Sequence, residues 1–164
     1  MPRPVAQPLR PATAAVVVAA ALAVAIAAGL VFGLSERPLM AWAAGSMACE
    51  VAWVLTLMGL WALEAGLSLA ALILAILVVV RGAANLRRGG IFILVAAAMG
   101  LFGMFGLSFE TYGDPPGLST VEIVFTVLEV LGGLVRIALL LAGVAIMVRS
   151  VQRLRRERGA RPRA

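Results

Sequence analysis

The chain has 164 residues, of which 63% are hydrophobic and 13% are charged, with a formal net charge of +6 and a mean hydropathy of +1.06. A soluble domain is about 45–50% apolar and about 25% charged, and a disordered chain is rich in charge and poor in aliphatic side chains, so both classes are excluded. We therefore expect an integral membrane protein with little mass outside the bilayer.

The residue inventory excludes most familiar membrane-enzyme chemistries. The chain has no His and no Lys, and Cys49 is its single cysteine. Imidazole-ligated haem, His-containing zinc sites, Ser–His nucleophile pairs, Schiff bases and intrachain thiol–disulfide exchange are thereby excluded. The single aspartate, Asp114, argues against a paired-aspartate protease. We expect no catalytic residue, no metal and no cofactor.

The amino-terminal 34 residues predict a tail and one membrane helix. Met1–Pro11 is expected to be flexible, because its repeated prolines do not sustain a helix. Ala12–Leu34 then runs without a charge for about 23 residues, enough to cross a hydrocarbon core of about 30 Å. A cleaved signal peptide is the alternative, but this run exceeds the usual length of about 7–15 apolar residues. We expect a retained span over 12–34.

The next apolar stretch is too long for one crossing. Leu39–Val80 holds about 42 residues and two charges, whereas a single crossing needs about 20 residues. One alternative is a span over 60–80 preceded by an extra apolar helical segment over 39–58. The other is a hairpin with its turn at Gly59–Gly66, where two glycines, a Trp and a carboxylate suit a turn. We favour the first alternative, which gives four spans, over the hairpin, which gives five.

Two further spans complete the prediction. Arg81–Gly90 holds three arginines and a Gly-Gly pair, and is expected to be a short basic loop. Spans are then expected over 91–108 and 119–148, separated by an aqueous turn at Phe109–Leu118 that contains Gly, Asp and tandem prolines. The predicted fold class is an all-α polytopic transmembrane bundle.

Charge predicts the orientation of this bundle, which covers 12–148 and precedes a basic tail over 149–164. The tail and the Arg81–Gly90 loop lie two crossings apart, so the positive-inside rule places both in the cytoplasm. Four spans then put both termini inside, whereas five put the amino terminus outside. We expect a multi-pass protein of a bacterial plasma membrane, because the use of Arg in place of Lys and the many Ala and Gly residues suggest a GC-rich genome.

Ionisable side chains within the apolar runs are the candidate functional residues. A charge at the bilayer centre costs roughly 2.5–3.5 kcal/mol on insertion scales, so each should face protein, water or a partner. Glu122 fits a capping box that begins at Ser119. The candidate charge network is Glu50, Glu64, Glu129 and Arg136.

Arg136, near the middle of the last predicted span, stays charged at any accessible pH and so requires a carboxylate. Glu129, Glu50 and Glu64 are the alternatives. A structural ion pair between helices is favoured over a proton or ion relay.

Other patterns are less specific. Trp53 and Trp61 fit an interfacial belt better than an aromatic-lined cleft for a small cation. Small residues at Gly29-x-x-x-Gly33 and around Gly100 predict close helix packing. The tail arginines are expected to contact anionic lipid headgroups, not nucleic acid, because they follow a membrane span directly. These arginines are Arg149, Arg153, Arg155, Arg156 and Arg158.

Two functional hypotheses follow from the sequence. The first is a non-enzymatic accessory or interaction subunit, or a homo-oligomer, whose partner is a membrane protein. The alternative is a small proton- or ion-coupled transporter or channel that uses the intramembrane Glu and Arg residues.

Overall fold

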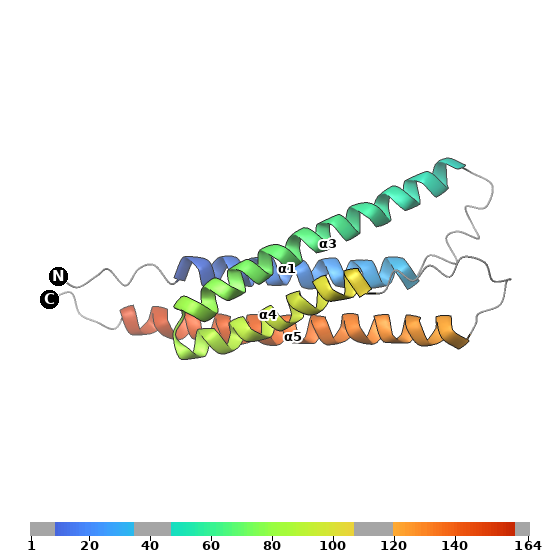
Figure 1. Ribbon diagram of the computed structural model, residues 1–164. Coiled ribbons are helices and arrows are strands. Elements are labelled where there is room, and N and C mark those ends of the chain that lie inside the picture. Colours follow the sequence, from blue (N-terminus) through green and yellow to red (C-terminus); the bar gives the residue numbers. More distant parts are fainter. Residues whose placement is uncertain (1–8, 35–46, 107–119, 160–164) are drawn as a thin grey trace.

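The computed structural model describes residues 9–34, 47–106 and 120–159, and these form four helices (Figure 1). The helices are α1 (Leu9–Leu34), α3 (Met47–Arg81), α4 (Ala84–Gly106) and α5 (Thr120–Gly159). Each is long and apolar enough to cross a membrane. The predicted all-α transmembrane bundle with four spans is confirmed, and the protein is a multi-pass membrane protein.

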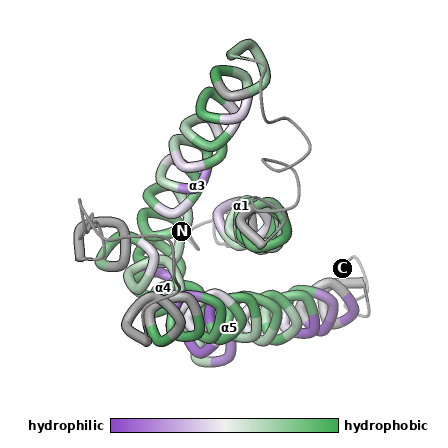
Figure 2. The backbone as a smooth tube through the Cα atoms, turned by 90° about the vertical axis from the view of Figure 1, so that its right-hand side faces the viewer, coloured by the Kyte–Doolittle hydropathy of each residue, from purple (hydrophilic) through white to green (hydrophobic). Residues whose placement is uncertain are grey.

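The four helices form a ring. α1 packs against α3 and α5, and α4 packs against the same two helices. The chain direction alternates around the ring, so the start of α1, the α3–α4 connection and the end of α5 lie at one end of the bundle (Figure 1). We call this the basic end, because it carries Arg81, Arg88 and Arg149, and we call the opposite end the distal end. In Figure 2, which looks along α1, α3 and α5 both run at an angle to that helix.

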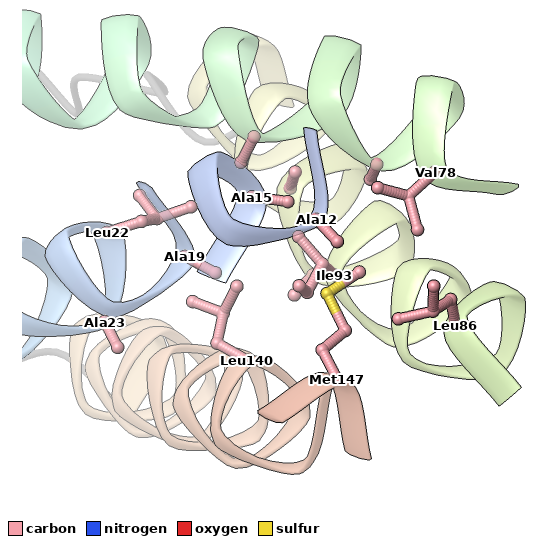
Figure 3. Packing of buried hydrophobic residues seen from close by; sticks show 14 of the residues in the cluster. Ala12, Ala15, Ala19, Leu22, Ala23, Val78, Leu86, Ile93, Leu140 and Met147 are labelled. Carbon is pink, nitrogen blue, oxygen red and sulfur yellow. The ribbon is translucent and has the colours of Figure 1, made fainter. Parts of the chain in front are cut away.

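The core is a seam of small and aliphatic side chains contributed by all four helices (Figure 3). Five of its α1 members are alternately three and four residues apart: Ala12, Ala15, Ala19, Leu22 and Ile26. Ala23 also belongs to the core. The α3 members Ala71, Ala75 and Val78 continue the same spacing, which is typical of left-handed helix packing. Inside lipid, helices associate through van der Waals contact, so alanines that let backbones approach closely hold the bundle together.

α3 is one unbroken helix of 35 residues, and the hairpin alternative is wrong. The helix runs through Gly59–Gly66 because a bilayer leaves no water to satisfy the backbone groups that a turn would free. Residues 47–58 of the extra apolar segment are the first part of this same helix, and residues 39–46 lie outside the described residues. A 35-residue helix is about 52 Å long, and its first half leads away from the bundle (Figures 1 and 2).

The basic loop predicted over Arg81–Gly90 is also wrong, because α4 already begins at Ala84. The Gly-Gly pair serves helix packing and not a turn. A β-carbon built at Gly89 would stand 2.7 Å from Cγ of Met147 and 2.9 Å from the carbonyl oxygen of Gly143, and one at Gly90 would stand 3.0 Å from Cγ2 of Val79. These two glycines therefore let α4 approach both of its neighbours.

The predicted boundaries of the first and last helices also differ from those in the structure. Leu9–Pro11 belong to α1 and not to the flexible tail. The first turn of a helix tolerates proline, because the backbone N–H groups there have no carbonyl partner within the helix and the missing N–H costs no hydrogen bond. α5 has 40 residues and continues through the first part of the basic tail to Gly159. The turn predicted at Phe109–Leu118 and the cap at Ser119 lie outside the described residues.

Candidate functional site

The candidate site is an ion pair between α5 and α3, the two helices that flank α4. Nη1 of Arg136 donates a hydrogen bond to Oε1 of Glu64 at 2.7 Å. The side chains are 13% and 20% exposed, respectively, so the pair is largely shielded within the bundle. Among the candidate carboxylates whose side chains the structure describes, Glu64 and Glu129, Glu64 contacts Arg136.

α4 completes the surroundings of the guanidinium. Nε of Arg136 donates to the carbonyl oxygen of Ala96 at 3.2 Å. A carbonyl oxygen has two lone pairs, so it can accept this bond in addition to its intrahelical one. One turn later, a β-carbon built at Gly100 would overlap Nη2 of Arg136 and stand 2.6 Å from its Cζ. Gly100 therefore makes the space that the guanidinium fills.

Two donors at this level of the bundle remain unpaired. Nη2 of Arg136 and Oγ of Ser68 are buried, and neither has a hydrogen-bond partner in the described part of the chain. Ser68 follows Glu64 by one helical turn and is fully buried on the same face of α3. A buried donor without a partner costs about 1–3 kcal/mol, so both groups favour an acceptor such as water. The described residues contain no group of three His, Cys, Asp or Glu that could hold a metal ion.

The two members of the ion pair lie at equal distances along their helices from the basic end. Glu64 precedes Arg81 by 17 residues, and Arg136 precedes Arg153 by the same number; both arginines end the apolar part of their helices. Glu64 is the midpoint of its span, whereas Arg136 lies nine residues after the start of the span Val127–Arg153.

The other predicted charges are not part of this pair. Glu129 is exposed on α5 and forms no ion pair with a described residue. Glu50 and Glu122 lie in α3 and α5, but their side chains are outside the described residues. In the tail, Arg149, Arg153 and Arg156 are exposed on α5, and the side chains of Arg155 and Arg158 are not described.

Trp53 and Trp61 lie in different surroundings. The ring of Trp53 stacks on Phe32 of α1, with ring centroids 3.9 Å apart and an interplanar angle of 13°. One face of Trp53 is therefore covered by Phe32. Trp61 is 61% exposed.

Sequence reasoning missed the contribution of α4. It marked Gly100 and Ala96 as packing residues, whereas they position the guanidinium through a gap and a backbone carbonyl. A backbone acceptor leaves no signal in the sequence. A signal for Glu64 did exist, because Glu64, Ser68, Ala71, Ala75 and Val78 are alternately four and three residues apart on the buried face of α3.

Comparison of the chain with models of protein families, with curated protein sequences and with solved structures gives no match. The site is therefore interpreted from its own residues.

Proposed function

We propose that the protein is a non-enzymatic interaction protein of a bacterial plasma membrane. It binds a second transmembrane helix, which belongs either to a partner membrane protein or to another copy of the chain. The observation that supports this proposal most directly is an exposed stripe of small residues that begins in the first half of α3 and ends just past the helix midpoint. We call it the outer stripe and define it as Ala52, Thr56, Gly59 and Gly66.

The outer stripe has the properties of a helix-packing surface. All four residues are exposed, and no heavy atom lies within 4 Å of a β-carbon built at Gly59 or Gly66. With about 100° between successive residues, these positions lie about 80–160° around α3 from Glu64, away from its seam. Small residues at such spacing let two helix backbones approach closely in a bilayer. The stripe therefore favours a helix that the described chain does not supply.

The state of the intramembrane charges also favours an interaction protein. Glu64 neutralises Arg136 within the chain, and the pair is anchored to the carbonyl of Ala96. A paired, hydrogen-bonded charge serves to fix helix positions, so it provides a stable frame for presenting the first half of α3.

A double substitution on the outer stripe tests this proposal. Gly59→Leu combined with Gly66→Leu fills the space over the stripe. We expect the complex in native membranes to lose at least tenfold in affinity, and the free energy of unfolding to change by no more than about 0.5 kcal/mol. The amount of complex is measured by thiol-directed crosslinking through Cys49, which is exposed near the start of α3.

Gly132→Leu is the matched control. Gly132 lies on α5 and also has no heavy atom within 4 Å of a built β-carbon, but it is not on the outer stripe. We expect its crosslinking yield to equal that of the wild type. Absence of any crosslinked species in the wild type, or equal losses in both variants, would contradict the proposal.

A small proton- or ion-coupled transporter is the second candidate. The buried, unpaired Nη2 of Arg136 and Oγ of Ser68 favour it, because water bound there would extend the polar site. Reconstituted vesicles with an internal pH-sensitive dye test this candidate. A transporter loses flux in Glu64→Gln and keeps it in the outer-stripe variant, whereas an interaction protein shows no flux in either.

A further inference from the structure

The basic end of the bundle carries a group of exposed arginines from three helices. We call this group the arginine collar: Arg81, Arg87, Arg88, Arg149 and Arg153. None of them forms an ion pair with a residue that the structure describes. The segments 81–90 and 149–164 contain ten arginines, and Glu157 is their single acidic residue. This end therefore has a strong excess of positive charge that the chain does not neutralise.

Helix packing brings the arginines of α4 and α5 to the same level. A β-carbon built at Gly143 would stand 2.9 Å from the carbonyl oxygen of Gly89, so the two helices touch there. Because α4 and α5 are antiparallel, Arg88 and Arg149 both lie on the basic side of this contact, within about two helical turns of it.

The arginines also share the outer surface of the α4–α5 pair. Arg88 is turned by about 100° from the packed face that Gly89 marks, and Arg149 and Arg153 are one turn apart and exposed on α5. On the α3 side, Nε of Arg87 donates to the carbonyl oxygen of Gly82 at 2.9 Å. This bond holds Arg87 beside the end of α3, which carries Arg81.

The collar lies at the ends of the apolar parts of three helices. The apolar part of α3 ends at Arg81, that of α4 begins at Ala84 and that of α5 ends at Arg153, so every collar arginine lies within four residues of such an end. We therefore expect the collar to lie near lipid headgroups. Guanidinium groups match phosphate oxygens in a two-point, charge-assisted geometry. Five positive groups gathered at one end of the bundle repel one another, and an anion that binds among them lowers this repulsion.

We infer that the arginine collar binds the phosphate groups of anionic phospholipids in the leaflet at the basic end, and that this binding attaches α4 and α5 jointly to that leaflet. The inference goes beyond the proposed function, because the collar and the outer stripe lie on different parts of the molecule. It also goes beyond a lipid-binding tail, because Arg81, Arg87 and Arg88 come from α3 and α4 and not from the tail.

The test measures binding of phosphatidylglycerol to the purified full-length protein in neutral detergent micelles. The collar variant combines Arg88→Gln, Arg149→Gln and Arg153→Gln. Each arginine near the headgroups contributes about a fivefold factor in affinity, so we expect the Kd to rise on the order of 100-fold. The control variant combines Arg37→Gln, Arg161→Gln and Arg163→Gln, which removes the same charge. We expect its Kd to rise less than about threefold, because none of these arginines belongs to the collar or to the tail arginines that directly follow α5's apolar part.

Three results would overturn the inference. Equal losses in the two triple variants would show attraction to net charge alone. Wild-type binding that persists undiminished in 1 M salt, where the screening length is about 3 Å, would exclude an electrostatic site. Displacement of the lipid by inorganic phosphate, or by a short oligonucleotide at matched ionic strength, would assign the collar to a free phosphate or to nucleic acid. The salt measurement needs no substitution, so it decides even if a triple variant fails to fold.

Discussion

At the scale of single residues, Arg136 determines the chemistry of the bundle. An arginine cannot avoid the cost of an apolar surrounding by losing its proton, so the chain supplies three compensations from two other helices. Glu64 provides the counter-charge, Ala96 provides a backbone acceptor, and Gly100 provides the space. The counter-charge and the space can each be removed by a single substitution, whereas the backbone carbonyl of Ala96 cannot.

Removing the carboxylate alone should destabilise the protein more than removing the whole pair. We expect Glu64→Gln to lower the free energy of unfolding by roughly 3 kcal/mol, because it leaves a shielded cation without a counter-charge. Adding Arg136→Leu should restore part of that loss. Unfolding in detergent, followed by circular dichroism, measures both. Glu129→Gln is the control, since Glu129 is exposed and should change stability by no more than about 0.5 kcal/mol. Additive losses in the double variant would mean that the two groups are not coupled.

Gly100→Ala should act through the guanidinium. The added β-carbon would occupy the position of Nη2, so Arg136 must shift against the bonds that hold it to Glu64 and Ala96. We expect a loss of about 1–3 kcal/mol, measured by the same unfolding assay.

Gly132→Ala provides the matched control, because open space surrounds Gly132 and a helical Gly→Ala change there is neutral or stabilising. The loss at Gly100 should shrink when Arg136→Leu is already present. An undiminished loss would show that the β-carbon disturbs α4 itself and not the guanidinium.

At the scale of helices, the sequence predicted apolar lengths well and turns poorly. Uncharged length alone identified most of α1 and the existence of four spans. The two glycine-containing segments that were considered as turns, Gly59–Gly66 and Arg81–Gly90, fall within or largely within helices. Glycine marks turns in water, but in a bilayer it also marks close helix packing, and composition does not separate these roles.

The partner of Arg136 was not predictable for a related reason. The sequence showed that Arg136 needs a carboxylate, but Glu50, Glu64 and Glu129 all met that requirement. Selecting Glu64 requires the relative positions of α3 and α5, which depend on the packing of both helices against α4.

The glycines of the α4–α5 contact should tolerate substitution by a larger residue far less than the glycines that face open space. A β-carbon at Gly143 would stand 2.8 Å from Cγ1 of Ile93 and 2.9 Å from the backbone oxygen of Gly89, which cannot move without shifting α4. We expect Gly143→Leu to lower the free energy of unfolding by at least about 2 kcal/mol. Gly29→Leu on α1, where no heavy atom lies within 4 Å, should leave it within about 0.5 kcal/mol. Equal effects in the unfolding assay would mean that α4 and α5 are not in direct contact.

At the scale of the whole molecule, charge divides the chain into two ends. The exposed arginines gather at the basic end, where the α3–α4 connection meets the last turns of α5. At the distal end, the sequence between α4 and α5 holds Glu110 and Asp114 and no arginine. Such a division orients a bundle in the membrane, because basic segments stay on the cytoplasmic side during insertion.

An even number of crossings puts both termini on the same side of the membrane. The start of α1 and the end of α5 lie at the basic end, and positive charge predicts that this end is cytoplasmic (Figure 1). A reporter that is active only in the periplasm should therefore be inactive when fused before Ala12 or after Ala164. The same reporter inserted after Gly113, between α4 and α5, should be active. Activity at the amino terminus together with a silent carboxyl terminus would require an odd number of spans and would contradict the four-span bundle.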